Sequence, residues 1–300
     1  MKTICFFASY FLGREVPYYI FVYLNELKKQ YKEVVLLTSN KDICSADLEK
    51  LRLEGIEIIV EKNEGFDFGL WYKAFQKFDV SVYDKIVLVN DSCILFKSLD
   101  EFVVWSNNDL SDLQGMTISE AVALHVQSYF LVLNRKAVSL LVQYFKIHGI
   151  CHRFIDVIRT YEIGFSSYLT ENGLSLASFI DNGGYTGWFS PYYFCIDYHL
   201  NAGIPVIKKK VLFSSYRKGE LISLARMGFN IDVEHYYRIL NGKHFLIIDL
   251  IKLRGEFPLC LDRRKIFQFN CLKFLIRCCM PLYPLYRFLK TYLIKVGVKR

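Results

Sequence analysis

The sequence predicts an α/β fold in which a sheet is covered by helices on both faces. In the first half of the chain, short apolar runs alternate with stretches of helical periodicity, and the turns between them are short. Alternation of this kind is typical of parallel strands joined by crossover helices. The 300 residues are 53% hydrophobic and 16% aromatic, which supplies enough apolar side chains for a large core.

The elements expected in the first half form a Rossmann-like unit. Each strand is a short apolar run, and each helix shows apolar residues at a spacing of three to four. The expected strands lie at residues 3–8, 33–38, 56–61 and 85–90. The expected helices lie at residues 17–30, 46–53 and 68–78.

The second half continues the pattern as far as a change of texture near residue 225. Strands are expected at residues 113–117, 127–134 and 175–180, and helices at residues 136–148 and 153–172. A loop rich in Gly, Asn and aromatic residues follows at 181–193. We therefore expect a body, residues 1–225, followed by a basic helical extension, residues 226–300.

The nine cysteines indicate a reducing cytoplasm. Their number is odd, they are scattered and no CxxC pair occurs, so neither a disulfide framework nor a zinc site is predicted. The apolar start of the chain lacks a small-residue cleavage site and is interpreted as a first buried strand. No apolar run reaches the roughly 18 residues of a membrane-spanning helix, so we expect no membrane crossing.

The basic residues are concentrated at the carboxyl end. Residues 263–300 hold ten Lys or Arg and no acid, so the rest of the chain sums to −2 although the whole carries +8. Here apolar residues at helical spacing, with Arg287, Lys290 and Lys295 on other faces, predict a basic amphipathic helix. Such a helix could lie on an anionic membrane or pack on the body by its apolar stripe. The sequence leaves both interpretations open.

Two polar segments about twenty residues apart are the most informative motifs. NEGFDFGLW, residues 63–71, is a glycine-punctuated loop leading into a helix, and KIVLVNDSCIL, residues 85–95, is a buried strand with a polar exit. Ligands of open α/β sheets gather at the carboxyl ends of strands. Glycine-containing loops let backbone N–H groups approach a phosphorylated ligand. We interpret the two segments as one nucleotide-sugar site.

With three further segments, these motifs resemble the rhamnan synthesis protein F family of bacterial glycosyltransferases. The segments are HVQSYFLVLNRKAV, YEIGFSSYLTENG and GIPVIKKKVL, and their order is that of the family. The likeness spans roughly residues 1–220. It implies a GT-A-like fold, a Rossmann-type mixed sheet flanked by helices, with a donor half at about 1–118 and an acceptor half at about 119–225.

The resemblance also implies a function in cell-surface polysaccharide assembly, as in capsule or lipopolysaccharide. Such an enzyme moves a sugar, rhamnose by the family's suggestion, from a nucleotide-sugar donor to a lipid-linked or growing glycan. We expect it at the inner face of the cell membrane, held by the basic tail. No nucleic-acid partner is expected, because the body is acidic and no reader motif occurs. The alternative is a noncatalytic carbohydrate- or membrane-binding scaffold with the same fold.

One departure from the GT-A pattern concerns the metal. Asn90, Asp91 and Ser92 stand where those enzymes carry Asp-x-Asp, so a single carboxylate remains. One carboxylate can still hold Mg²⁺ or Mn²⁺ when phosphate and water oxygens complete the shell. His199 is the second candidate ligand. A divalent cation is therefore an expectation of the resemblance that this sequence supports only in part.

Donor contacts are expected from both motifs and from the lysine run, whose ammonium groups could pair with a diphosphate. Two alternatives stay open: Asp67 could cap a helix that begins at Phe68, and the lysines could line a solvated edge strand. Asp91 could contact the metal or the donor sugar, or could be a simple turn residue. The donor-site candidates are Asn63, Gly65, Asp67, Gly69, Asn90, Ser92, Lys208 and Lys209.

On the acceptor side, an inverting transferase needs a carboxylate base within hydrogen-bond reach of the acceptor hydroxyl. Glu162 is the leading candidate, with Glu120 and Glu171 as rivals and an ordinary surface salt bridge as the alternative. Together with Asp91 it forms the predicted catalytic set. The pocket candidates beside it are His125, Gln127 and Ser128. Aromatic candidates for sugar stacking are Trp71, Trp188, Tyr192 and Tyr193, and core packing is preferred for Trp71.

Overall fold

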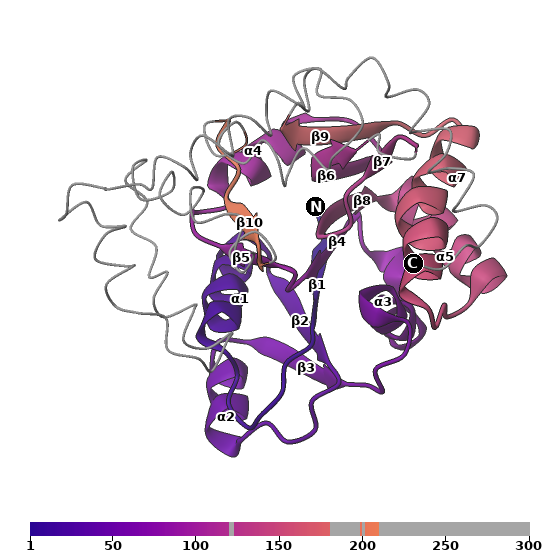
Figure 1. Ribbon diagram of the computed structural model, residues 1–300. Coiled ribbons are helices and arrows are strands. Elements are labelled where there is room, and N and C mark those ends of the chain that lie inside the picture. The colour runs from indigo at the N-terminus through magenta and orange to yellow at the C-terminus, as the bar shows by residue number, and fades with distance from the viewer. Residues whose placement is uncertain (120–122, 181–198, 200–201, 210–300) are drawn as a thin grey trace, which may run out of the picture.

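In the computed structural model, the chain forms a mixed sheet with helices on both faces, as the sequence predicted (Figure 1). The structure describes residues 1–119, 123–180, 199 and 202–209. The strands are Thr3–Ser9 (β1), Glu33–Thr38 (β2), Ile56–Val60 (β3), Lys85–Asn90 (β4), Cys93–Leu95 (β5), Leu113–Ser119 (β6), His125–Val126 (β7), Phe130–Asn134 (β8), Leu176–Ile180 (β9) and Val206–Lys208 (β10). Within the described residues the large sheet runs β3-β2-β1-β4-β8-β6-β7, and β9 pairs with β6.

The first four strands are parallel, and β1 lies between β2 and β4. Phe6 of β1 is opposite both Val35 and Leu88, so the register places three buried side chains in one row. Alternate residues of β1 enter different cores: Ile4 and Phe6 pack on one face, and Cys5 and Phe7 on the other. Burial of both faces is why these strands are continuous apolar runs.

Two groups of helices cover the two faces (Figure 1). Tyr18–Gln30 (α1), Ser45–Leu53 (α2) and Asp100–Asn108 (α4) contribute to one hydrophobic core. Phe66–Lys77 (α3), Arg135–His148 (α5) and Phe165–Glu171 (α7) contribute to the other, and a short 3₁₀ turn, Val80–Val82 (η1), precedes β4. The predicted helices are confirmed, and their ends differ from expectation by one or two residues.

The strand expected at 127–134 is confirmed as β8, which starts three residues later, at Phe130. A separate short strand, β7, precedes it, and a turn at Ser128 and Tyr129 lies between the two. β7 pairs only with β6 among the described strands, whereas β8 pairs antiparallel with both β4 and β6. The apolar run was read correctly as strand-like, but a period-two pattern does not show where a chain leaves one neighbour for another.

The single helix expected at 153–172 is also wrong in its detail. It consists of Phe154–Val157 (α6), a π-helical segment Ile158–Gly164 (η2) and α7. At the end of the π-helix, a Cβ on Gly164 would lie 2.7 Å from the Tyr144 hydroxyl and 2.8 Å from the Arg159 carbonyl oxygen. Only glycine fits that close approach without displacement of its neighbours. π-Helical turns inside α-helices are frequent at functional sites.

A second, two-stranded sheet brings a distant part of the chain to the end of β4. β10 pairs antiparallel with β5, with Lys208 opposite Cys93, and the Lys209 N–H donates to the Ser92 carbonyl oxygen at 2.9 Å. Val206 and Ile207 are buried in the same core as β5. The lysine run is thereby fixed beside the polar exit of β4.

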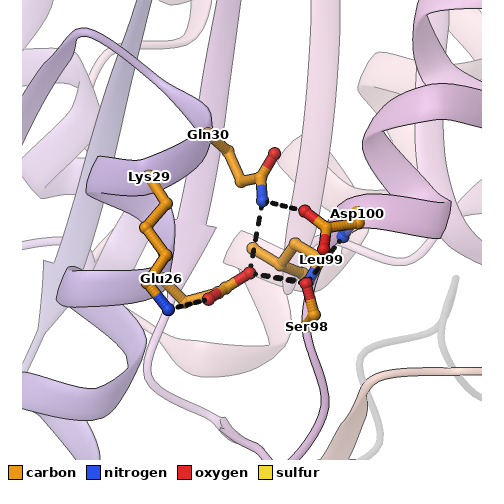
Figure 2. A network of polar contacts seen from close by, with 6 residues as sticks. All are labelled: Glu26, Lys29, Gln30, Ser98, Leu99 and Asp100. Atoms are coloured by element: carbon orange, nitrogen blue, oxygen red, sulfur yellow. Dashed lines mark hydrogen bonds and ion pairs between the residues drawn. The ribbon is translucent and has the colours of Figure 1, made fainter.

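A buried carboxylate joins α1 to the start of α4 (Figure 2). Glu26 accepts hydrogen bonds from the Leu99 backbone N–H at 2.9 Å and from the Ser98 hydroxyl at 3.0 Å. Its other oxygen pairs with Lys29 at 3.1 Å. Helix N-termini carry unsatisfied N–H donors, so Glu26 caps α4 from another element.

Several expectations fall outside the described residues. These are the loop at 181–193, the boundary near 225 and the basic extension with its amphipathic helix. Among the helices that the structure describes, none is long and apolar enough to cross a membrane.

Candidate functional site

The candidate site lies where β1 and β4 end, and Asp91 is its centre. Asp91 Oδ2 accepts hydrogen bonds from the Ser9 hydroxyl at 2.9 Å and from the Tyr19 hydroxyl at 3.2 Å. The Lys209 ammonium lies 3.3 Å from the same oxygen and 3.1 Å from the Tyr19 hydroxyl. Four segments distant in sequence thus meet at one carboxylate. Burial and the charge of Asp91 raise the pKa of Tyr19, so its hydroxyl stays neutral and donates.

Asn90 connects Asp91 to the glycine loop. Its side-chain amide donates to Asp67, its amide oxygen accepts from the Ser92 N–H at 3.1 Å, and the amide lies 3.4 Å from the Ser128 carbonyl oxygen. Desolvation, and then the charges of Glu162 and Asp91, raise the pKa of Asp67 to about 6. The carboxyl group of Asp67 is therefore held more strongly in its neutral form than a free aspartate, beside the charges of Glu162 and Asp91.

The start of α3 differs from the sequence expectation. The helix begins at Phe66, not Phe68, and Gly65 precedes it in the left-handed conformation with φ of 75°. Asp67 lies inside the first turn, and Gly65 occupies the N-cap position, so the interpretation of Asp67 as the cap of a helix that begins at Phe68 is wrong. Phe66 also has a positive φ, 58°, which is uncommon for a bulky residue and marks local strain.

Gly69 explains why the loop and helix can fold so tightly. A Cβ at this position would overlap the Glu64 carbonyl oxygen, so the loop backbone rests directly on the helix. Ser92 and Asn63 have exposed side chains. The close packing brings Asp67 toward the strand exit, while Asn63 remains at the surface of the loop.

On the acceptor side, the structure brings Glu162 and His125 together. Glu162, on the π-helix, has an Oε1 atom 3.8 Å from His125 Nε2, and both side chains are largely buried. His125 Nδ1 lies 2.7 Å from the Ala123 carbonyl oxygen. Because a carbonyl can only accept, Nδ1 carries the proton in the neutral ring, and Nε2 presents a lone pair toward Glu162. A hydroxyl or a proton between the two groups would satisfy both.

Gln127 and Ser128 lie at the same sheet edge, next to Tyr129. Gln127 accepts a hydrogen bond from Thr117 at 2.8 Å, and Thr117 also lies 2.7 Å from the Tyr129 hydroxyl. The Lys208 ammonium lies 5.1 Å from the centre of the Tyr129 ring, a cation–π distance. Lys208 and Lys209 are both partly buried, so the interpretation of a solvated lysine strand does not hold for these two residues.

Other predicted residues take no part in this arrangement. Trp71 is fully buried against Phe68, which confirms core packing, and Glu171 is exposed at the end of α7. The residues predicted from sequence at Glu120, Trp188, Tyr192 and Tyr193 lie outside the described residues.

The described residues do not fit a divalent-metal site. The Asp91 carboxylate is already paired with the Lys209 ammonium, and His199, the second expected ligand, is fully buried. Among the residues that the structure describes, no group of three or more His, Cys, Asp or Glu side chains could hold a metal ion. A like-charged neighbour disfavours a cation at the same carboxylate.

Sequence reasoning missed Ser9 and Tyr19. Ser9 is the last residue of a buried strand and lies at the same end of the sheet as Asn90. This position at a strand end was the signal in the sequence that could have identified it. Tyr19 gave no signal, because an aromatic residue in the first turn of an amphipathic helix is most often part of the core. Its hydroxyl becomes functional only through the position of α1 relative to β4.

Comparison with known proteins gives a family match and distant likenesses in fold. The rhamnan synthesis protein F family matches residues 35–237. No curated protein sequence matches the chain. A Bacillus anthracis protein assigned as a glucose-1-phosphate thymidylyltransferase, solved with sucrose, is 9% identical with a TM-score of 0.42 and covers 59% of this chain and 85% of its own.

Two further structures show a similar degree of likeness. A cytidylyltransferase from Leptospira borgpetersenii is 15% identical, with a TM-score of 0.38, over 60% of this chain and 76% of its own. The glycosyltransferase GlyE from Streptococcus pneumoniae is 15% identical, with a TM-score of 0.37, over 72% of this chain and 56% of its own. All three TM-scores are below 0.5, so the functional inferences rest on this chain's own residues. On the family match, which covers well over half of its length, the chain belongs to the rhamnan synthesis protein F family.

Proposed function

We propose that this protein is a glycosyltransferase that moves a sugar from a nucleotide-sugar donor to an acceptor hydroxyl. The observation that carries the proposal is the meeting of two chemically distinct groups at one sheet edge. The donor group is Asp67, Asn90 and Asp91 with Lys209, and the acceptor group is Glu162 with His125. The family to which the chain belongs supports the same class of reaction.

On the donor side, the start of α3 and the lysines provide for a phosphorylated ligand. Backbone N–H groups at a helix N-terminus attract anions, and α3 begins directly after Gly65. Asp67, with its raised pKa, and Asn90 offer hydrogen bonds to sugar hydroxyls. Lys208 and Lys209 neutralise the diphosphate as it leaves.

On the acceptor side, we assign Glu162 as the general base. The acceptor oxygen attacks the anomeric carbon, the bond from that carbon to the phosphate oxygen breaks, and its electron pair leaves with the nucleoside diphosphate. The hydroxyl proton passes to the Glu162 carboxylate, whose Oε1 lies 3.8 Å from His125 Nε2. A base opposite the leaving group serves inversion at the anomeric centre.

The finer assignments follow the family. The donor sugar is rhamnose and the acceptor is a lipid-linked or growing polysaccharide. The ten basic residues within 263–300 hold the protein at an anionic membrane surface. These assignments rest on the sequence and the family name.

A donor screen tests the proposal. Purified protein is offered UDP-, GDP- and dTDP-sugars together with membranes and acceptor lipid, with and without Mg²⁺ or Mn²⁺, and nucleotide release is followed. We expect release from one nucleotide class, lost in a folded Asp91→Ala variant. Folded wild-type protein that turns over none of the donors would contradict the proposal and favour the noncatalytic scaffold.

A further inference from the structure

The charge partner of Asp91 is a lysine from a distant part of the chain. Lys209 Nζ lies 3.3 Å from Asp91 Oδ2 and 3.1 Å from the Tyr19 hydroxyl, and 4.9 Å from the centre of the Tyr19 ring. The Lys209 side chain is 19% exposed and that of Asp91 14%. The ammonium is therefore held by two side chains, Asp91 and Tyr19, while part of the Lys209 side chain remains exposed.

The fold places Lys209 there independently of any ligand. Pairing of β10 with β5 sets the register, and the Lys209 N–H donates to the Ser92 carbonyl oxygen, one residue after Asp91. At the other end of this two-stranded sheet, the Phe96 N–H donates to the Pro205 carbonyl oxygen at 3.0 Å. Backbone hydrogen bonds thus fix Lys209 beside the residues that follow β4.

From this arrangement we propose that Lys209 is the resident cation of the donor site and that nucleoside diphosphate binding needs no divalent metal. The inference deepens the proposed function and rests on it. Asp91 acts as the anchor of the ammonium rather than as a metal ligand. Ser9 and Tyr19 support the anchor, since their hydroxyls donate to the same oxygen.

The chemistry of an ammonium suits this role. Lys209 has three N–H donors, and its contacts with Asp91 and Tyr19 use two of them. The third can donate to a phosphate oxygen without breaking the anchor. A phosphate that receives this charge-assisted hydrogen bond is stabilised both before and after the bond to the sugar breaks.

The test is calorimetric titration of UDP, GDP and dTDP into the full-length protein, once in EDTA and once with Mg²⁺ or Mn²⁺. We expect at least one diphosphate to bind in EDTA with a Kd within about threefold of its value with metal. Lys209→Met should weaken that binding about tenfold or more, as for loss of a charge-assisted hydrogen bond. Lys209→Arg should retain most of it.

Two further variants make the result specific. Lys136→Met removes an equally basic, exposed side chain from the start of α5, at the opposite edge of the sheet, and should leave the Kd unchanged. Asp91→Asn/Lys209→Met removes both charges together, so no carboxylate is left unpaired. It should fold, as judged by circular dichroism, and still bind the diphosphate weakly in EDTA.

The outcomes separate this inference from the proposed function. Diphosphate binding that appears only with added metal, or that survives unchanged in Lys209→Met, overturns the inference and leaves the transferase intact. Lysine-dependent binding in EDTA without sugar transfer supports the inference and contradicts the transferase. Binding of none of the three diphosphates under either condition overturns both.

Discussion

At the scale of single residues, the site is a set of charges whose neighbours decide their roles. Asp91 is paired with an ammonium, Asp67 is not, and Glu162 faces a histidine. The same side-chain chemistry thus gives an anchor, a carboxyl group with a raised pKa and a candidate base. The neighbours of each carboxylate, an ammonium for Asp91, the Asn90 amide for Asp67 and an imidazole for Glu162, separate their roles.

The role of Glu162 predicts a specific kinetic defect. Glu162→Gln should lower kcat by about 100-fold or more, while the Kd of the donor nucleotide stays within about twofold, because general-base catalysis contributes about that much. Steady-state kinetics and titration of the nucleoside diphosphate measure the two separately. Glu171→Gln, at the exposed end of α7, is the matched control and should retain activity. An equal loss in both variants would contradict the assignment.

His125 is a positioning residue, and its substitution should change the pH profile. In His125→Asn the Ala123 carbonyl can keep a donor, but Glu162 loses the ring nitrogen at 3.8 Å. We expect kcat to fall and the pH dependence of kcat to shift, with the nucleotide Kd preserved. A reduced rate with an unchanged pH profile would indicate a purely structural role.

Asp67 predicts a pH dependence of folding. Its pKa in the folded protein, about 6, is above its ordinary value of 3.8, so between these values the unfolded chain releases the proton first. The free energy of unfolding therefore falls as the pH rises through this window. In Asp67→Asn this contribution, on the order of 2 kcal/mol, should be absent. Urea unfolding of both proteins at about pH 4 and about pH 7 checks it, and parallel pH curves for the two would contradict the assignment.

At the scale of elements, the site depends on how helices are joined to the strands. The π-helix presents Glu162, left-handed Gly65 and Phe66 at the start of α3 precede Asp67, and the pairing of β10 with β5 places Lys209. The first two of these features depart from regular secondary structure. Such departures are concentrated at functional sites, because regular elements alone do not direct side chains from several segments to one point.

The contact between α1 and α4 predicts a stability effect remote from the site (Figure 2). Burial acts to raise the pKa of Glu26, but hydrogen bonds from the Leu99 N–H, Lys29 and Ser98 lower it, and the net pKa is below the ordinary value. Glu26 therefore stabilises the folded protein fully when the pH is above its ordinary pKa of 4.5. This stabilisation is lost as the pH falls through the lower pKa of Glu26 in the folded protein.

Glu26→Ala should reduce the free energy of unfolding by about 2 kcal/mol at neutral pH, because the Leu99 N–H and the Ser98 hydroxyl lose a buried acceptor. Urea denaturation followed by circular dichroism measures the change. Glu49→Ala, an exposed acid on α2, should cost much less. A loss at Glu26 no larger than at Glu49 would show that the network does not hold the two helices together.

At the scale of the whole molecule, charge is distributed along the chain between an acidic body and a basic end. If the end binds an anionic membrane, the triple variant Arg287→Gln/Lys290→Gln/Lys295→Gln should partition about 100-fold more weakly into phosphatidylserine vesicles, at about 1 kcal/mol per residue. Vesicle sedimentation at two salt concentrations measures this. Lys32→Gln/Lys41→Gln/Lys136→Gln, on the body, is the control with the same loss of charge, and equal weakening would point to net charge alone.

Much of this protein was determined by local patterns in its sequence. Apolar runs and helical spacing predicted most elements to within one or two residues, because burial on both faces leaves a continuous signal along a strand. The glycine loop and the strand exit predicted where a site would lie, and Asp67, Asn90, Asp91, Glu162 and His125 were all named from their motifs.

Only the tertiary structure decided what these residues contact. Ser9 and Tyr19 contact Asp91 although 82 and 72 residues separate them from it in the sequence. Lys209 is also distant in the sequence, and the pairing of β10 with β5 places it beside Asp91. The later start of the strand expected at 127–134, and the π-helix whose end at Gly164 packs against Tyr144, likewise came only from the tertiary structure. Sequence periodicity reports which face of an element is buried, whereas the order of strands sets which distant side chains share an edge and hence which charges meet.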